Sequence, residues 1–178
     1  MAHDQTLPQL WLLSDERNDA HLEDALRALP RGSGFIYRHY HLPDPDRWQR
    51  FQALRRSAEA RGHLVILADS ALTAPEWGAH GVYGAPLALW PRRAGRIQLA
   101  TAHNPREIAQ AARKGADAVL LSPAFPTRSH PGAPSLGPAR FRLLARLSPV
   151  PVIALGGMTP KTASRLRWPQ WAAIDGLS

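Results

Sequence analysis

A proline-bounded segment over residues 123–132 gathers four side chains that could bind an anion. Thr127 and Ser129 supply hydroxyls, Arg128 supplies a guanidinium and His130 supplies an imidazole. Such a loop could fold over an anionic leaving group and donate hydrogen bonds to it. Because loops of Pro, Ser, Gly and His are also typical of plain surface connections, the composition leaves both interpretations open.

A second feature is the glycine pair Gly156-Gly157, which follows the apolar run Pro151–Leu155 and precedes Thr159-Pro160. Two glycines allow backbone N–H groups to come close to a phosphate, and the start of a helix adds a favourable dipole. A tight turn that binds nothing also uses glycine. The pair predicts a phosphate-binding turn, with a purely structural turn as the alternative.

Three histidines stand near expected strand ends, namely His39, His41 and His103. A strand would place His39 and His41 on one face, where they could ligate a metal or carry protons. The sequence places no third ligand beside them, and His103 adjoins Asn104, which has the pattern of a helix cap. We therefore expect structural or exposed histidines here rather than a metal centre.

The elements that position these residues are short β-rich runs alternating with amphipathic stretches, as in repeated strand–helix units. Apolar spacings of three and four residues, together with the cap and Pro signals, predict helices over Asp19–Leu29, Asp46–Arg61, Asn104–Lys114 and from Thr159-Pro160 to about Trp168. The predicted strands are Leu10–Leu13, Gly34–Arg38, Leu64–Leu67, Gly81–Tyr83, Ile97–Thr101, Ala118–Leu121, Val152–Leu155 and Ala172–Leu177.

Eight strands mostly followed by helices predict an α/β protein with a compact (β/α)8 TIM barrel, formed as a single domain over residues 1–178. The segment from Tyr83 to Ile97 leaves room only for a short fourth helix. Since the chain stops directly after the last predicted strand, we expect the final helix to be missing. In such barrels the chemistry lies at the carboxyl ends of the strands, where the residues described above cluster.

The composition bears on whether the protein binds nucleic acid, spans a membrane or lies in the cytoplasm. The net charge is +8, and 20 of the 22 basic residues are Arg, scattered without a long cluster or interleaved aromatics, so we expect no nucleic-acid binding. No apolar run reaches the roughly 20 residues of a membrane span. The absence of Cys and of a signal-peptide pattern is consistent with a cytoplasmic protein.

Several motifs resemble the thiamine-phosphate synthase and thiazole tautomerase (TenI-like) superfamily. They are Gly115-Ala-Asp117 before a strand, Ser122-Pro-Ala-Phe-Pro-Thr-Arg-Ser-His-Pro-Gly132, Pro149-Val-Pro-Val-Ile-Ala-Leu-Gly-Gly-Met-Thr-Pro160 and the opening Leu10-Trp-Leu-Leu-Ser-Asp15. The resemblance is strong over 98–178 and thin over 40–95. It implies a (β/α)8 barrel that joins hydroxymethylpyrimidine diphosphate to hydroxyethylthiazole phosphate and releases diphosphate, with these small phosphorylated molecules as its partners.

The resemblance also implies roles for individual residues. The diphosphate side of the site would be formed by Arg38, Thr127, Ser129 and His130. The thiazole-phosphate side would be formed by Thr101, Gly156, Gly157, Leu177 and Ser178. Mg²⁺ would be held by Asp69, but the second Asp that the family places after the fourth strand is absent, because no acidic residue occurs between Trp77 and Arg106.

Two alternatives accompany this prediction. One is a TenI-like tautomerase that moves a proton on a thiazole phosphate without a metal, with His39, His103 or His130 as the base. The position that matches the family's catalytic histidine is Pro123 here. The other is a barrel that binds a phosphorylated ligand without turnover. A homo-oligomer is compatible with each of these functions.

Overall fold

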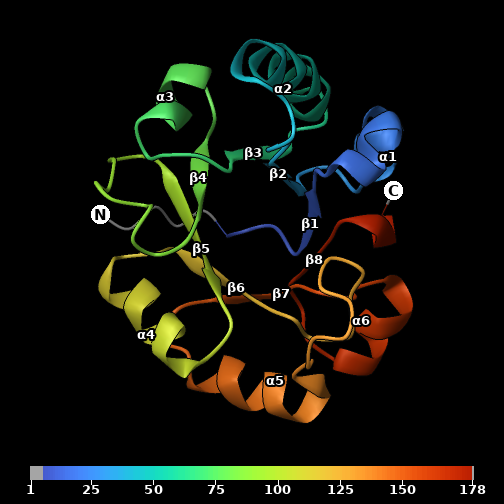
Figure 1. Cartoon of the computed structure of the whole chain (residues 1–178), viewed down its shortest axis with the longest axis vertical. Coiled ribbons are helices and arrows are strands. Elements are labelled where there is room, and N and C mark those ends of the chain that lie inside the picture. Colours follow the sequence, from blue (N-terminus) through green and yellow to red (C-terminus); the bar gives the residue numbers. More distant parts are fainter. Residues whose placement is uncertain (1–5, 178) are drawn as a thin grey trace.

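Short apolar runs of the chain form the eight parallel strands of a closed barrel (Figure 1). The structure is a computed structural model that describes residues 6–177. Each strand pairs with the next along the chain, and β8 closes the barrel onto β1 with Leu10 opposite Trp171. The strands are β1 (Leu10–Leu13), β2 (Gly34–Tyr37), β3 (Leu64–Leu67), β4 (Gly81–Gly84), β5 (Ile97–Ala102), β6 (Ala118–Leu121), β7 (Val152–Ala154) and β8 (Trp171–Ala173). The (β/α)8 prediction is confirmed.

Alternation along the strands divides the buried residues into two layers. Trp11 and Leu13 belong to the cluster inside the barrel, whereas Leu12 belongs to the layer between the barrel and the helices. The indole of Trp11 lies against Gly34 on β2, where an added Cβ would lie 2.0 Å from Trp11 Cε3. Glycine at this position therefore makes room for the largest side chain of the barrel interior.

Helices surround the barrel as an outer ring (Figure 1). The α-helices are α1 (Leu22–Ala28), α2 (Asp44–Glu59), α3 (Thr73–Trp77), α4 (Pro105–Arg113), α5 (Gly137–Leu147) and α6 (Pro160–Leu166), and two 3₁₀ helices are η1 (Glu16–His21) and η2 (Asp175–Leu177). The predicted cap is confirmed, since the Asn104 side chain accepts a hydrogen bond from Glu107 N at 3.0 Å. Among the described residues, no helix has both the length and the apolar character needed to cross a membrane.

The sequence did not predict α3 and α5, and three of the predicted segments differ in the structure. The last predicted strand was too long, because β8 ends at Ala173 and the chain then turns into η2. The predicted first helix is divided into η1 and α1, and the N-cap of η1 is Asp15. Between β4 and β5 the described chain forms turns instead of a short helix. Pro86, Pro91 and Gly95 lie in that segment, and they interrupt helical hydrogen bonding.

Candidate active site at the carboxyl end of the barrel

A cavity of about 710 Å³ lies at the carboxyl ends of the strands. This volume falls within the range of small-molecule sites. Its wall is formed by the ends of β2, β4, β5, β6, β7 and β8 and by the segments that follow them. The cationic or imidazole side chains in the wall are Arg38, His103, Arg128 and His130, and the one acidic side chain among the lining residues is Asp175. The cavity is therefore suited to an anionic ligand.

Seven of the ten predicted site residues line this one cavity. They are Arg38, Thr101, Thr127, Ser129, His130, Gly156 and Gly157. Asp69 is not among the lining residues. Leu177 packs against the layer between barrel and helices, while its neighbours Asp175 and Gly176 line the cavity. Ser178 lies outside the described residues.

The glycine pair adopts backbone conformations that a side chain would strain. Gly156 has φ +96° and Gly157 has φ +61°, and both lie close to the segment that follows β6. A Cβ on Gly156 would lie 2.7 Å from Pro123 Cα, and one on Gly157 would lie 2.3 Å from Pro126 O. Glycine is thus required where the β7–α6 turn contacts the loop after β6, and it leaves the turn's backbone exposed to the cavity.

The loop after β6 is attached to its neighbours on two sides. Its start pairs with the end of β7 through Ala124 N to Leu155 O at 2.8 Å and Phe125 N to Gly156 O at 3.0 Å. Across the mouth of the barrel, Arg17 Nη2 donates to Ser129 Oγ at 3.1 Å. Arg17 of η1 therefore connects to the hydroxyl-bearing part of the loop, which lines the cavity.

Arg38 enters the cavity from the end of β2 and is held by three hydrogen bonds. Its backbone N donates to Ser14 Oγ at 2.7 Å, its Nε to Ser14 O at 3.1 Å and its Nη2 to Asp15 Oδ2 at 2.5 Å. Burial raises the pKa of the Asp15 carboxyl, but the Arg17 amide and the guanidinium groups of Arg17 and Arg38 outweigh it and lower that pKa. The ion pair thus holds the Arg38 guanidinium in the cavity wall beside an ionised Asp15.

Two further polar side chains of the wall come from β4 and the end of β5. Burial raises the pKa of Tyr83 to about 12, so its phenol is a neutral hydrogen-bond donor at pH 7. His103 Nδ1 lies 2.9 Å from Glu107 Oε2 of α4. His103 is thus bound to the first turn of α4 and also lines the cavity.

The side chains near Asp69 do not fit a bound Mg²⁺. Asp69 Oδ2 accepts from Arg47 Nη1 at 2.5 Å and Asp69 Oδ1 from Ser70 N at 2.6 Å, so both oxygens have protein partners. Burial raises the Asp69 pKa, yet the Ser70 amide and the Arg47 guanidinium outweigh it, and the carboxylate stays ionised. Within residues 6–177, no group of three His, Asp or Glu side chains is arranged to hold a metal. The Asp69 metal assignment therefore stays a prediction without a ligand set.

Sequence reasoning missed Arg47, which connects two strand ends. From α2 its guanidinium donates to Arg38 O at 3.0 Å, to Ala68 O at 2.8 Å and to Asp69. It is buried within 6 Å of the ring centres of Tyr37, Tyr40 and Trp77. A helical Arg between apolar positions gives no sequence signal for such a role, because the contact depends on how α2 packs on the barrel.

Comparison with known proteins identifies a family, curated relatives and solved structures to which this chain is similar. The model of the family described as thiamine monophosphate synthase matches residues 10–174. A thiamine-phosphate synthase of Chloroflexus aurantiacus is 30% identical over 180 residues, covering 96% of this chain and 82% of the relative. One of Thioalkalivibrio sulfidiphilus is 32% identical over 127 residues, covering 67% of this chain and 60% of the relative. The structure of a thiamine phosphate pyrophosphorylase from Pyrococcus furiosus matches with a TM-score of 0.78 and 21% identity, over 93% of this chain and 84% of that one.

Proposed function

Because the chain belongs to the thiamine monophosphate synthase family, we propose that it acts in thiamine biosynthesis as a condensing enzyme. Its substrates would be hydroxymethylpyrimidine diphosphate and hydroxyethylthiazole phosphate. The thiazole nitrogen would form a bond to the pyrimidine methylene while the C–O bond to the diphosphate breaks, and the electron pair of that bond would leave with the diphosphate. The observation that carries this proposal is the shared cavity of Arg38, Thr127 and Gly156.

We assign the polar groups of the cavity wall to two anions. Arg38, Thr127, Ser129 and His130 supply a guanidinium, two hydroxyls and an imidazole for the diphosphate. Donors of this kind stabilise the charge that develops on a leaving group. The backbone of Gly156 and Gly157 would receive the thiazole phosphate, with Thr101 beside it. Binding both substrates in one cavity would bring the nitrogen and the methylene together.

Neutralisation of the diphosphate would come from this chain's own cations. Asp69 is paired with Arg47, and the segment Tyr83–Arg96 contains no acidic residue that could complete a metal site. Arg38, Arg128 and His130 lie in the cavity wall instead. Guanidinium groups match phosphate oxygens in a bidentate manner, which suits them to this role.

The test is an assay of the purified protein with both substrates, in Mg²⁺ and in excess EDTA. We expect thiamine phosphate in both conditions, with a difference of less than about threefold in rate. Calorimetric titration with Mn²⁺ alone should give no binding heat. Product that forms only with Mg²⁺ would contradict the assignment of the cations, and no product in either condition would contradict the synthase itself.

The alternative function is tautomerisation, for which the cavity wall offers His103. Its ring lies in the cavity wall and contacts Glu107, so it could act as a general base on a thiazole phosphate. Isomerisation of a thiazole carboxylate phosphate, followed by ultraviolet absorbance, separates the two functions. We expect no isomerisation, since the two hydroxyls of the loop after β6 have no use in that reaction. Tight binding of thiamine phosphate without either reaction would instead indicate a binding protein.

A further inference from the structure

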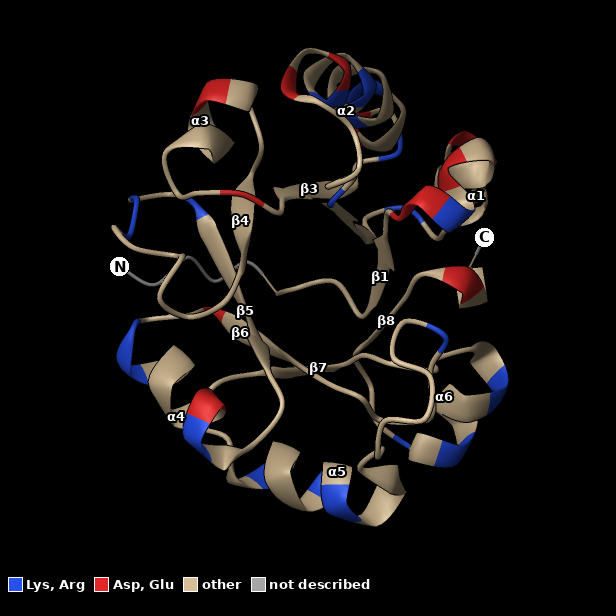
Figure 2. Cartoon of the chain, viewed as in Figure 1, with Lys and Arg blue, Asp and Glu red and all other residues tan. Residues whose placement is uncertain are grey.

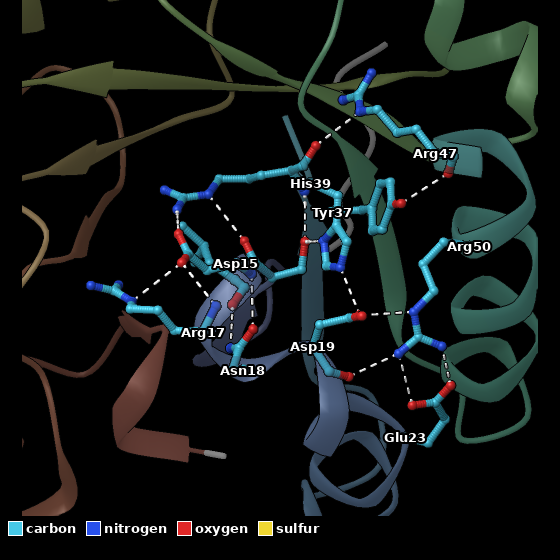
Figure 3. A network of polar contacts seen from close by, with 12 residues as sticks. Asp15, Arg17, Asn18, Asp19, Glu23, Tyr37, His39, Arg47 and Arg50 are labelled. Atoms are coloured by element: carbon cyan, nitrogen blue, oxygen red, sulfur yellow. Dashed lines mark hydrogen bonds and ion pairs between the residues drawn. The ribbon is translucent and has the colours of Figure 1, made fainter. Parts of the chain in front are cut away.

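Two buried residues, Ser14 and His39, and the half-exposed Asp19 form a continuous series of hydrogen bonds, in which Figure 3 shows the contact between His39 and Asp19. Ser14 Oγ lies 2.8 Å from His39 Nδ1, and His39 Nε2 lies 2.7 Å from Asp19 Oδ1. These are the residue types of a nucleophilic triad, but Ser14 is 0% exposed and is not among the cavity-lining residues. Ser14 therefore cannot attack a substrate, and the series of hydrogen bonds must have a role other than nucleophilic catalysis.

The direction of each hydrogen bond follows from the groups involved. An ionised Asp19 only accepts, so Nε2 of His39 carries the proton. Burial lowers the pKa of His39 more than the contact with Asp19 raises it, which keeps the ring neutral and leaves a lone pair on Nδ1. Ser14 must then donate its O–H to Nδ1. The same Oγ is left as the acceptor for the backbone N–H of Arg38, at 2.7 Å.

The series of hydrogen bonds from Asp19 through His39 to Ser14 ends at Arg38. Ser14 holds the residue twice, through Oγ to the backbone N and through its carbonyl to Nε, and Asp15 holds Nη2. No residue in the range 6–177 accepts a hydrogen bond from Arg38 Nη1, and the side chain lines the cavity. The guanidinium is thus fixed on one side and open to a ligand on the other.

The backbone of His39 indicates that this arrangement is enforced. His39 has φ +41°, a left-handed conformation that is rare outside glycine and needs support from its surroundings. Its ring stacks on Tyr37 with centroids 4.7 Å apart and planes 14° apart. Asp19 is in turn fixed by Arg50 Nε at 2.8 Å, and Arg50 also pairs with Glu23 (Figure 3).

We propose that Asp19, His39 and Ser14 are positioning residues that fix Arg38 in the geometry that binds the diphosphate. This inference rests on the proposed function, because it gives Arg38 the diphosphate as its ligand. The series of hydrogen bonds acts through Arg38 alone and touches no substrate. It follows that breaking it weakens diphosphate binding only while Arg38 is present.

The experiment measures the affinity for inorganic diphosphate by calorimetry in Ser14→Ala and His39→Asn, each alone and combined with Arg38→Ala. Asparagine is chosen because it tolerates a positive φ. The fold provides controls of the same residue types, since Ser33 and His63 are also buried, at the opposite end of the barrel, where the backbone N of Ser33 donates to His63 Nδ1. Ser33→Ala and His63→Asn remove the same groups far from the cavity.

We expect Ser14→Ala and His39→Asn to weaken diphosphate binding about tenfold, a change of the size of roughly one hydrogen bond. The two control variants should lower the melting temperature without changing that affinity. In the Arg38→Ala background, Ser14→Ala should have no further effect on binding, which is the signature of two residues that act as one. Equal affinity in Ser14→Ala and the wild type, or an undiminished effect without Arg38, would overturn the proposal.

A second readout covers variants that fold poorly. In ¹⁵N spectra of the wild type, His39 should be neutral with its proton on Nε2, and the Arg38 Nε–H should be protected from exchange. Asp19→Asn keeps the acceptor oxygen and should preserve both signals, whereas Asp19→Ala should lose the protection of Arg38. Protection that persists in Asp19→Ala would overturn the positioning role. A wild type that binds diphosphate but forms no thiamine phosphate contradicts only the proposed function.

Discussion

At the scale of single residues, the proposed binding of diphosphate depends on Arg38. Arg38 carries a fixed guanidinium in the cavity wall, whereas the other guanidinium there, Arg128, is exposed on the loop after β6. A side chain already held by Ser14 and Asp15 loses little entropy when a ligand binds. The residue type and its place after β2 were predictable from the sequence. The partners that hold it were not, because they lie between β1 and η1, more than 20 positions away in the chain.

We predict that Arg38→Met lowers kcat/KM by about 100-fold, since a charge-assisted contact to the leaving group is lost. Arg27→Met is the matched control, because Arg27 is an exposed arginine of α1 far from the cavity lining. Steady-state kinetics with both substrates give the measurement. Equal losses in the two variants would mean that general charge, and not the position of Arg38, matters.

The burial of His39 predicts how stability depends on pH. Its pKa in the folded protein lies below the ordinary 6.5, mainly through burial, with Asp19 opposing and His41 and Arg50 assisting. The unfolded chain therefore binds more protons than the folded protein near pH 6. The contribution of His39 to the free energy of unfolding is then complete above about pH 6.5 and falls as the pH is lowered. Urea unfolding at a series of pH values should show this fall.

The variant His39→Asn separates the contribution of His39 to the pH dependence of stability from that of other residues. His63 is also buried with a lowered pKa, so His39→Asn should reduce the pH dependence but not abolish it. A variant with the full dependence of the wild type would show that His39 does not titrate as described.

At the scale of elements, the site depends on the contact between the β7–α6 turn and the loop after β6. The sequence predicted each segment separately, through the glycine pair and the Thr-Arg-Ser-His run. It could not predict the distances that make glycine necessary, since these arise only when β6 and β7 pair in the sheet. The strand β8 was predicted too long for a related reason. Its apolar tail packs as η2 against the helix layer, and a short apolar run looks the same in either conformation.

We predict that Gly157→Ala weakens binding of the thiazole phosphate by at least tenfold, because its Cβ would lie 2.3 Å from Pro126 O and displace the loop. Gly132→Ala is the control, since Gly132 also has a positive φ, +76°, but nothing lies within 4 Å of its added Cβ. Calorimetric titration of both variants gives the affinities. If Gly132→Ala weakened binding as much, backbone strain and not the close contact would be responsible.

At the scale of the whole molecule, the positive charge is unevenly distributed. Residues 97–178 contain ten of the 22 Lys and Arg residues but only three of the 14 Asp and Glu residues. Figure 2 shows this excess of blue over red on α4, α5 and α6, which flank the β6 and β7 side of the barrel. The scattered arginines in the sequence gave no sign of a patch, because the barrel brings their helices side by side. Such a field attracts anions toward the cavity.

This distribution predicts a dependence of substrate capture on ionic strength. Raising the salt concentration from about 0.02 to 0.3 M shortens the screening length severalfold, so kcat/KM should fall several-fold while kcat stays nearly constant. Replacing Arg140 and Arg146 on the exposed face of α5 with Gln should flatten that dependence. A kcat/KM that does not change with salt would exclude a steering role for these helices.

The central claim is that one cavity binds two anionic substrates and transfers the pyrimidine group between them. The most direct test is ³¹P NMR of the protein with hydroxymethylpyrimidine diphosphate, before and after addition of hydroxyethylthiazole phosphate. We predict no free diphosphate before the addition, and afterwards diphosphate and thiamine phosphate in equal amounts. Diphosphate released without the thiazole, or no release with it, would contradict the account.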